Sequence, residues 1–463
     1  MENSKTKSIA IVSLVLFIEG FVGLAYQMLY IRQLSPLVGN SVQVVSWIVG
    51  VFLIALAIGY KMGGNVDSKF EFHLSKNFLI AALIGGFGLS FIFVRNLFAF
   101  AGPYIDYYYI MIAYCFLIIA PTTYYLGQTV PIMTNMMKGK TVSEISGNVL
   151  FLSTIGSFLG AILTTNIFLR FFGVSLTIFI STFMLIILFV YFDIAKARTK
   201  LSYSISFAIA SVLSIILYSL HTIYEKNVYI ATNQYANYEV VNLNNGEGKG
   251  FKSNDSLSSV IMNDGRKLGY VNIIDSILFR EQKLKDKDIL VIGAGGFVVS
   301  EGILNNKFDY VDIDPMIKDV AEKSFLKHKI NGTFIPEDGR AYLAKKNKKY
   351  DVIFLDAFVS YKSIPEHMAT MEYFKLIKEN LNENGIFTVN VIGSRDFDTE
   401  YTRNIFTTIN SQFPFCFIHN TDYRYNLANM VFVCKKVEEK GKIYTDNKNN
   451  ANNDYSELKI DIF

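Results

Sequence analysis

A glycine turn and a set of carboxylates are the residues of this chain that are best suited to chemistry. Residues 288–296 predict a short buried strand that runs directly into the turn, where Gly293 and Gly295 allow the backbone to approach a nucleoside. We expect a helix after the turn, with unpaired N–H groups at its start. About twenty residues further on, a second strand ends at Asp312, the spacing at which an α/β sheet offers an acid to ribose hydroxyls.

Two further acids follow at the ends of predicted strands. Asp338 comes directly before Gly339, and Asp356 closes the apolar run 350–355. Ligands of open α/β sheets bind beyond the carboxyl ends of the strands, so these residues would meet in one crevice. A glycine turn alone is also typical of a tight strand-to-helix connection without a ligand. Four such elements in register favour a nucleoside site.

The elements that must position these residues follow a long apolar region. Apolar runs long enough to cross a bilayer are expected at 8–31, 41–62, 77–99, 104–127, 146–169, 174–193 and 203–221. We therefore predict four parts: an α-helical membrane domain at 1–222 with about seven spans, a small β-hairpin layer at 223–284, a doubly wound Rossmann-like sheet of methyltransferase type at 285–436, and a disordered polar tail at 437–463.

Basic residues in the loops predict the orientation of the spans. Those on the side of the N-terminus are Lys5, Lys7, Lys61, Lys69, Lys76, Lys138, Lys140, Lys196, Arg198 and Lys200. Those on the other side are Arg32, Arg95 and Arg170. The positive-inside rule thus predicts a multi-pass cell-membrane protein with a cytoplasmic N-terminus. Seven spans would then put the C-terminal domain outside, whereas a nucleoside made in the cytosol favours the cytoplasmic side for that domain.

Some residues within the spans have two interpretations. Glu19 is a functional candidate because a carboxylate is costly in a bilayer, but it also fits a hydrogen-bonded packing group. Pro121 and the run 127–131 predict a break in the fourth span, for which a packing kink is favoured over a binding cavity. Gly156 and Gly160 predict close approach of two helices.

Turns, cysteines and charge complete the picture. The β-hairpin layer is expected to include a hairpin over 259–268 with its turn at Asp264 and Gly265. Cys115, Cys416 and Cys434 lack metal-ligand spacing, so we expect buried free thiols and no metal. The net charge of +4 suggests no nucleic-acid partner.

The order of these motifs resembles the spermidine synthase (polyamine aminopropyltransferase) family, in particular its membrane-fused bacterial branch. The resemblance is based on 291–296, 311–314, 337–339 and 350–358 in the second half, and on Glu19 to Arg32 and 126–131 in the first. It implies an aminopropyltransferase that uses decarboxylated S-adenosylmethionine, or S-adenosylmethionine itself, with a small-molecule amine as acceptor and the lipid bilayer as a further partner. A homo-oligomer is compatible with the sequence.

The resemblance also implies roles for single residues. Gly293, Gly295 and Gly339 would lie at the nucleoside, Asp312 would hold the ribose hydroxyls, and Asp338 would take the adenine amino group. Asp356 would be the catalytic base, which agrees with the chemistry, because an amine must lose a proton as it attacks a sulfonium carbon.

Departures from the family pattern concern acceptor recognition. Gly296 and Val359 stand where the family has aspartates, Ala236 replaces the glutamine after Tyr235, and the tyrosine-histidine-glutamate run after the second hairpin is missing. A diamine carries two charges and needs carboxylates at both ends. Tyr235 remains a substrate-binding candidate. Glu366 and His367 are expected either to replace the lost polar groups in a gate or to lie in a surface loop without chemistry.

Three functional hypotheses therefore stay open. The first is a membrane-tethered aminopropyltransferase. The second is an S-adenosylmethionine-dependent transferase with another acceptor, and the third is a transporter or sensor that binds a nucleoside without turnover. Asp356 favours an enzyme.

Overall fold

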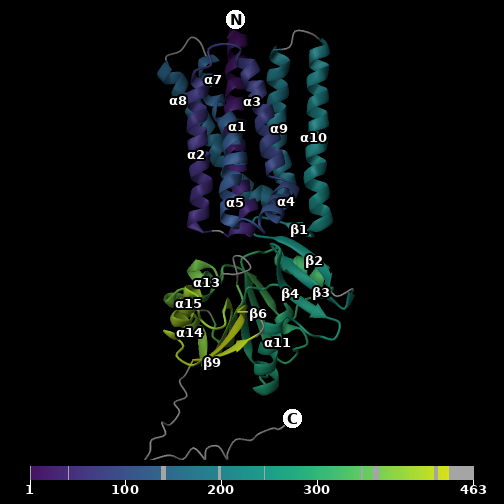
Figure 1. Cartoon of the computed structure of the whole chain (residues 1–463), viewed down its shortest axis with the longest axis vertical. Helices are drawn as coiled ribbons and strands as arrows, with labels where there is room; N and C mark the ends of the chain where they lie inside the picture. The colour runs from purple at the N-terminus through teal and green to yellow at the C-terminus, as the bar shows by residue number, and fades with distance from the viewer. Residues whose placement is uncertain are drawn as a thin grey trace, which may run out of the picture.

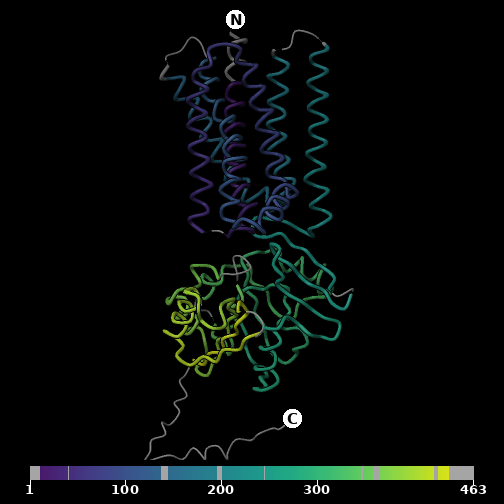
Figure 2. Tube along the Cα trace, viewed as in Figure 1, coloured from purple at the N-terminus to yellow at the C-terminus, as the bar shows by residue number. Residues whose placement is uncertain are grey.

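The N-terminal half of the chain is a bundle of long helices, and the C-terminal half is an α/β domain (Figure 1, Figure 2). The computed structural model describes residues 2–39, 41–136, 142–196, 200–243, 246–345, 348–357, 364–421 and 426–436. The predicted polar tail at 437–463 and Val359 lie outside these residues. The chain passes from the bundle to the α/β domain at the end of its tenth helix.

The helices of the bundle follow the predicted apolar runs. They are α1 (Glu2–Val38), α2 (Val42–Gly64), α3 (Phe70–Gly88), α4 (Phe91–Ala101), α5 (Tyr107–Tyr114), α6 (Ala120–Gly127), α7 (Thr129–Met136), α8 (Val142–Leu163), α9 (Leu169–Lys196) and α10 (Lys200–Val228). Five helical segments are long and apolar enough to cross a membrane, or six if α3 and α4, bent by 58°, form one span. Because α10 continues to Val228, the bundle ends six residues beyond the predicted boundary.

One of these segments, Glu144–Ala195, is a pair of helices rather than one. Its backbone is not helical at Gly173, where φ is 74° and ψ is −176°. The next amide, of Val174, donates to Thr232 in the first strand of the α/β domain, whereas Asp193 accepts from Ser75 near the start of α3. The segment therefore folds back at Gly173. The described helices then cross the bundle seven times, as α1, α2, α3 with α4, α5 to α7, α8, α9 and α10.

One end of the bundle lies beside the α/β domain, and the other end points away from it. The N-terminus lies at the end away from the α/β domain, and α10 ends beside that domain (Figure 1). The fourth run, which contains Pro121, extends from α5 near the α/β domain to α7 at the far end. The start of the chain and the α/β domain thus lie at opposite ends of the bundle.

Glycines allow α1 and α8 to pack in direct backbone contact. A Cβ atom at Gly156 would lie 2.2 Å from the carbonyl oxygen of Phe17, and one at Gly160 would lie 2.1 Å from that of Phe21. On α1, a Cβ atom at Gly20 would lie 2.1 Å from the carbonyl oxygen of Ser153. The predicted close helix approach is confirmed for Gly156 and Gly160.

The fourth run is broken where its prolines predict. A π-helical turn, Cys115–Ile119, precedes Pro121, and the helix is interrupted again at Gln128 between α6 and α7. Two glycines of α2 lie against this run. A Cβ atom at Gly59 would lie 2.5 Å from the carbonyl oxygen of Tyr124, and one at Gly63 would lie 2.6 Å from that of Gln128. These contacts support the interpretation of the break as a packing feature.

A four-stranded antiparallel sheet follows the bundle. Its strands, in spatial order, are β1 (Ala231–Thr232), β2 (Asn237–Leu243), β3 (Gly248–Ser253) and β4 (Ser256–Met262). The hairpin predicted around Asp264 and Gly265 is wrong, because a short loop there leads into helix α11 (Gly269–Asp275). The tight hairpin turn is instead at Asn254 and Asp255, both at positive φ (52° and 67°), between β3 and β4.

The central element of the α/β domain is a seven-stranded sheet with the order β10-β11-β9-β8-β5-β6-β7. The strands are β5 (Asp288–Ile292), β6 (Lys307–Asp312), β7 (Thr333–Pro336), β8 (Tyr350–Leu355), β9 (Leu381–Ser394), β10 (Cys416–Asn420) and β11 (Leu427–Lys435). Strands β5 to β9 are parallel, and β11 pairs antiparallel with both β9 and β10. The chain reverses direction across the sheet between β5 and β8, which makes their carboxyl ends the topological switch point.

Both faces of this sheet are covered, so its central strands are apolar on both sides. Ile289 and Val291 of β5 pack with the hairpin layer, α11 and helix α12 (Ile317–Val320). Leu290 and Ile292 pack with helices α13 (Gly339–Ala344), α14 (Met371–Asn380) and α15 (Glu400–Asn410) on the other face. This double burial holds the carboxyl edge of the sheet in place.

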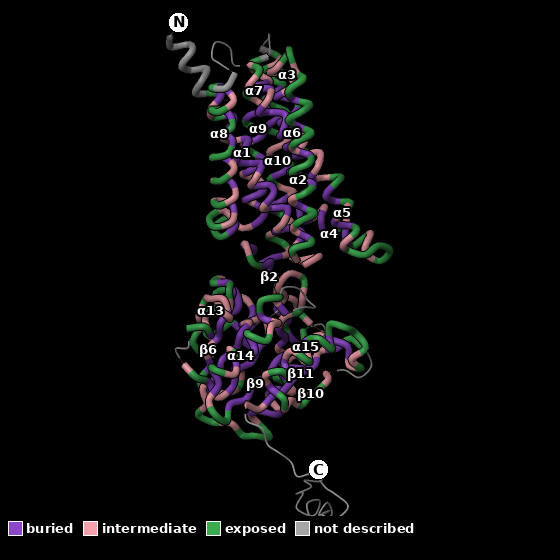
Figure 3. The backbone as a smooth tube through the Cα atoms, turned by 90° about the vertical axis from the view of Figure 1, so that its left-hand side faces the viewer, coloured by how far each residue is buried: buried purple, intermediate pink, exposed green. Residues whose placement is uncertain are grey.

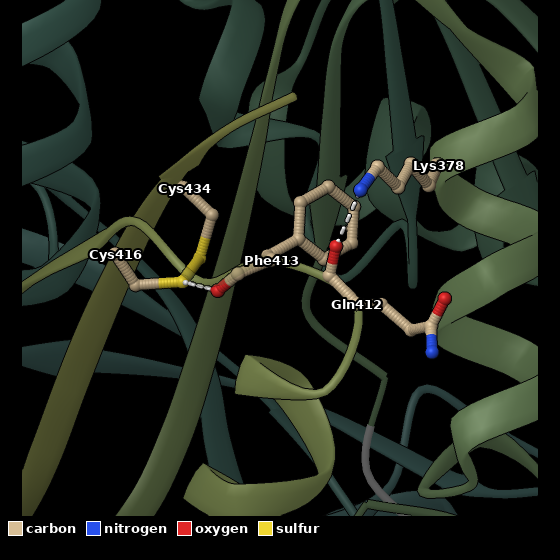
Figure 4. Close-up of a disulfide and its surroundings, with 5 residues drawn as sticks. All are labelled: Lys378, Gln412, Phe413, Cys416 and Cys434. Carbon is tan, nitrogen blue, oxygen red and sulfur yellow. Dashed lines mark hydrogen bonds between the residues drawn. A yellow bond between two sulfur atoms is a disulfide. The ribbon is translucent and has the colours of Figure 1, made fainter. Parts of the chain in front are cut away.

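The cysteines differ in part from the prediction. Cys115 is free and buried, as expected. Cys416 and Cys434 form a disulfide between β10 and β11, so the prediction of free thiols is wrong for this pair (Figure 4). The two residues are direct partners in the antiparallel ladder. The spacing of cysteines along the sequence does not reveal this, because the strand register brings them together.

Candidate active site

The glycine turn lies at the switch point of the sheet. Gly293 follows β5 at φ 92°, and a Cβ atom there would lie 2.4 Å from the carbonyl oxygen of Asp356 at the end of β8. Gly295 also has a positive φ of 50°, and its Cβ atom would lie 3.0 Å from the hydroxyl oxygen of Ser259. Both positions therefore require glycine, and the turn brings Gly293 and Asp356 together as predicted.

The helix expected after the turn is not formed. The chain makes only a 3-10 turn at Val298–Ser300, after Phe297 at a positive φ of 61°. Phe297 is fully buried against Tyr310, and Tyr310 accepts a hydrogen bond from the amide of Ser300. Because a three-residue turn offers no helix N-terminus, a nucleoside would be held by the turn itself and by the neighbouring acids.

Gly296, which stands where the family has an aspartate, fits a crowded position. Its amide donates to the Ser259 hydroxyl at 2.8 Å, and a Cβ atom would lie 2.6 Å from the ring of Phe325. An aspartate would not fit here without movement of that ring. The packing around Gly296 thus leaves no room for the aspartate that the family has at this position.

Asp312 at the end of β6 is tied to the glycine turn. Its Oδ2 accepts from the amide of Ala294 at 2.9 Å, and its Oδ1 accepts from the amide of Asp314 at 3.0 Å. Burial raises the pKa of Asp312 to about 6, while these two backbone N–H groups act in the opposite direction. The position beside the turn agrees with a role at ribose hydroxyls.

Asp314 has a different environment from Asp312. Its side chain is buried, with 2% exposure, and its Oδ2 accepts from the side-chain amide of Asn233 at 2.7 Å. The hydroxyl of Tyr238 hydrogen-bonds to the same oxygen, and the amide of Met316 donates to Oδ1 at 2.8 Å. Asp314 thus connects β6 to the hairpin layer.

Asp356 follows β8 and is held by two side chains. The hydroxyl of Tyr270 in α11 donates to its Oδ2 at 2.7 Å, and the side-chain amide of Asn390 in β9 donates to its Oδ1 at 3.0 Å. Both oxygens therefore have a fixed orientation beside Gly293. A carboxylate that is positioned in this way can accept a proton from a neighbouring group.

Burial and hydrogen bonding act in opposite directions on the pKa of Asp356. Burial raises its pKa to about 7, while the hydrogen bonds from Asn390 and Tyr270 lower it. Burial and the nearby Asp356 raise the pKa of Tyr270 well above its ordinary value, so Tyr270 stays protonated and donates. A base is most effective when its pKa lies near the working pH.

Asp338 and His367 form a second polar pair near this edge. Asp338 caps α13, with its Oδ1 accepting from the amide of Ala341 at 2.9 Å, and its Oδ2 lies 3.1 Å from Nε2 of His367. Arg340 donates to the carbonyl oxygen of His367 at 2.5 Å. A Cβ atom at Gly339 would lie 2.5 Å from Ile292 of β5, so this cap packs on the strand that leads into the turn.

Two further predicted residues have looser positions. Glu366 precedes His367 in a 3-10 turn, Glu366–Met368, and is exposed. Tyr235, between β1 and β2, is 39% exposed, and its amide donates to Oδ1 of Asn233 at 2.8 Å. Direct roles for Glu366 and Tyr235 in acceptor binding stay predictions.

Sequence reasoning missed three side chains of this site. Tyr270 and Asn390 hold Asp356, and Ser259 binds the glycine turn. They come from α11, β9 and β4, so no local motif links them to the residues that they contact. The sequence pattern identified only Asp312 and Asp356, the acids at the ends of β6 and β8.

The strand order and the antiparallel β11 define a Rossmann-like sheet of methyltransferase type. Residues 273–448 match the family model described as the spermine/spermidine synthase domain. This part of the chain thus contains a domain of the spermine/spermidine synthase family. The spermidine synthase family predicted from the motifs is confirmed for this domain, and its membrane-fused branch stays a prediction.

Curated relatives carry related names. A polyamine aminopropyltransferase of Vibrio vulnificus is 32% identical over 133 residues, which cover 26% of this chain and 44% of the relative. The chain thus covers less than half of that relative's length. A polyamine aminopropyltransferase of Oceanobacillus iheyensis is 23% identical over 401 residues, covering 79% of this chain and 74% of the relative. That alignment is longer than the part of the chain after α10, so it includes helices of the bundle.

Among solved structures, the spermidine synthase of Thermotoga maritima is similar to 48% of this chain and to 82% of its own chain. Its sequence identity with this chain is 16% and the TM-score is 0.37.

Proposed function

We propose that this chain is a membrane-tethered aminopropyltransferase that transfers an aminopropyl group from decarboxylated S-adenosylmethionine to an amine acceptor. The observation that carries the proposal is Asp356, held by Tyr270 and Asn390 beside Gly293 at the switch point of the sheet. Membership in the spermine/spermidine synthase family supports the reaction type.

The chemistry needs one base and a well-placed donor. The neutral amine attacks the carbon next to the sulfonium, a C–N bond forms, the C–S bond breaks, and its electron pair returns to sulfur as methylthioadenosine leaves. The proton that the amine loses passes to Asp356, whose raised pKa suits it for this role. Proximity of the two reactants supplies much of the remaining acceleration.

The residues for the donor are those beside the turn. Gly293 and Gly295 allow close approach of the nucleoside, Asp312 accepts hydrogen bonds from ribose hydroxyls, and Asp338 accepts one from the adenine amino group. The two backbone N–H groups that donate to Asp312 favour its carboxylate form and fix its orientation for this purpose. His367, paired with Asp338, is the side chain that we assign to the acceptor.

The outer surface of the bundle supports membrane tethering. Large apolar side chains point outward from several helices, for example Leu117 with 68% exposure, Phe151 with 63% and Ile215 with 65%. In Figure 3, exposed positions recur along helices whose other positions are buried. A soluble surface rarely has so many exposed apolar groups, whereas lipid chains would cover them.

Turnover assays on the purified full-length chain test the proposal. The chain is incubated with decarboxylated S-adenosylmethionine and with a panel of monoamines and diamines, and release of methylthioadenosine is measured. We expect release that depends on an amine and is lost in Asp356→Asn.

The same assay, together with calorimetric binding of each donor, separates the other hypotheses. Turnover with S-adenosylmethionine alone, with S-adenosylhomocysteine as product, would favour a transferase with another acceptor. Binding of both donors without any product would favour a non-catalytic sensor or transporter. Either result would overturn the proposal.

A further inference from the structure

The first helix of the bundle reaches into the α/β domain through one arginine. Arg32 of α1 is buried, with 7% exposure. Its Nε donates to the carbonyl oxygen of Asn233 at 2.6 Å, and its Nη2 donates to Oδ1 of Asn237 at 2.7 Å. The guanidinium thus holds both ends of the short connection between β1 and β2.

Asn233 passes this contact on to the edge of the sheet. Its Oδ1 accepts from the amides of Tyr235 and Ala236 at 2.8 Å and 3.0 Å, which fixes the orientation of the side-chain amide. Its Nδ2 therefore points to Asp314 and donates to Oδ2 at 2.7 Å. Asn233 and Asp314 are both 2% exposed, so water does not compete for these bonds.

The last step reaches the acid beside the glycine turn. The amide of Asp314 donates to Oδ1 of Asp312, and the amide of Ala294 donates to Oδ2 of Asp312. Hydrogen bonds thus link Arg32 to Asp312 by way of the main chain and the side chain of Asn233 and of Asp314. They join a helix of the bundle to the carboxylate that we assign to the ribose.

Neutral groups accept the described hydrogen bonds of Arg32. No carboxylate lies within ion-pair distance of Arg32 in the part of the chain that the structure describes, and its Nη1 has no hydrogen-bond partner there. The acids that face the guanidinium at longer range are Glu225 and Asp314. Arg32 is thus anchored by neutral acceptors, and the side chain of Asn233 carries the contact on to Asp314.

We propose that Arg32 is a positioning residue for the nucleoside site: through Asn233 and Asp314 it holds Asp312 in place, so that the bundle and the donor site are coupled. The inference rests on the proposed role of Asp312. Coupling is reciprocal, so a bound nucleoside also stabilises the contact between α1 and the hairpin layer.

A second arginine provides a matched control. Arg95 of α4 also joins the bundle to the hairpin layer, with Nη2 3.1 Å from Oδ1 of Asp255 and Nη1 3.1 Å from the hydroxyl of Tyr229. The pair of Arg95 and Asp255 is about one-third exposed and lies at the turn between β3 and β4. Its described bonds do not lead to Asp312, so loss of Arg95 tests contact between the two parts without the link from Arg32 to Asp312.

The experiment compares Arg32→Gln, Arg32→Lys and Arg95→Gln in the full-length chain. Calorimetry with methylthioadenosine measures nucleoside affinity, and hydrogen exchange measures protection of the amides of Ala294 and Asp314, which donate to Asp312. We expect Arg32→Gln to weaken affinity by about ten-fold, within the usual range of coupling between sites. The amides of Ala294 and Asp314 should exchange faster in this variant. Arg32→Lys should recover part of both effects, and Arg95→Gln should change neither.

Two results would overturn the inference. One is unchanged affinity and protection in Arg32→Gln. The other is an equal loss in Arg32→Gln and Arg95→Gln, which would indicate general separation of the two parts. If the unmodified chain does not bind methylthioadenosine, the proposed function fails, but exchange at Ala294 and Asp314 still decides whether Arg32 holds Asp312.

Discussion

The hydroxyl of Tyr270 donates to Oδ2 of Asp356 at 2.7 Å. Tyr270 thereby fixes one carboxylate oxygen while Asn390 fixes the other, and both hydrogen bonds oppose the effect of burial on the pKa of Asp356. The result is a carboxylate that is ionised above about pH 7 and protonated below it. Predictions about catalysis follow from this relationship.

Replacement of Asp356 by asparagine should remove the base and keep the shape. We expect activity to fall on the order of a hundred-fold or more, with little change in nucleoside affinity. Release of methylthioadenosine and calorimetry measure the two quantities. A parallel fall in both would mean that Asp356 anchors the donor's charge, and undiminished turnover would remove it from the mechanism.

The melting temperature of the same variant provides a folding control with its own pH dependence. Burial raises the pKa of Asp356 in the folded state, so the folded chain binds more protons than the unfolded chain between about pH 4 and pH 7. This residue therefore lowers stability as pH rises through that window. We expect Asp356→Asn to melt no lower than the unmodified chain at pH 8, with a smaller relative gain at pH 4.

Loss of the Tyr270 hydroxyl should shift the pH profile. The Tyr270 hydrogen bond lowers the pKa of Asp356, so Tyr270→Phe should raise that pKa and move the acid limb of the kcat profile to higher pH. At pH values well above the new limb, most of the activity should return. A variant that loses activity equally at all pH values would show that Tyr270 acts on the substrate instead.

Asp312 should matter for binding more than for transfer. Hydrogen bonds from ribose hydroxyls to a carboxylate are charge-assisted, each worth roughly 1.5–3 kcal/mol. Asp312→Ala should therefore weaken nucleoside binding by about ten-fold or more in a calorimetric titration. Because burial raises the pKa of Asp312 to about 6, affinity of the unmodified chain should also fall as pH drops through 6. Unchanged affinity in a folded Asp312→Ala would show that the nucleoside lies elsewhere.

The ends of the bundle should report opposite sides of a membrane. Reporter fusions before α1 and after Val228 measure this. Equal signals from both would contradict a bundle that the chain crosses seven times. Under the proposed function we expect the α/β domain in the cytoplasm, where the donor is made. The basic loops predict a cytoplasmic N-terminus, and the two expectations conflict because the two ends of the bundle are opposite. The Cys416–Cys434 disulfide is typical of an oxidising compartment and therefore favours the opposite side for the α/β domain. A reporter after Val228 that is active only outside the cell would overturn the proposed function.

Features that depend on neighbouring residues could be predicted from the sequence. The apolar run of β5 followed by Gly293 identified the glycine turn, and Asp312 and Asp356 were identified because they end apolar strands. The same local reasoning failed at Asp264 and Gly265, where a favourable turn sequence is followed by a helix instead of a strand.

Features that depend on distant contacts could not be predicted. Tyr270 lies 86 residues before Asp356, and Arg32 lies 201 residues before Asn233. Only the fold brings these side chains together, and no spacing rule covers such separations. The Cys416–Cys434 bond depends in the same way on the register between β10 and β11.

The Cys416–Cys434 disulfide has a consequence for a chain that a protease has cleaved. It closes a loop over a sequence separation of 18 residues, and β11 lies inside the sheet between β9 and β10. A protease that cleaves between Cys416 and Cys434 would therefore leave two fragments that remain covalently joined and still paired along β11. Such a nicked molecule would migrate as one band on a gel without reductant and as two bands with it.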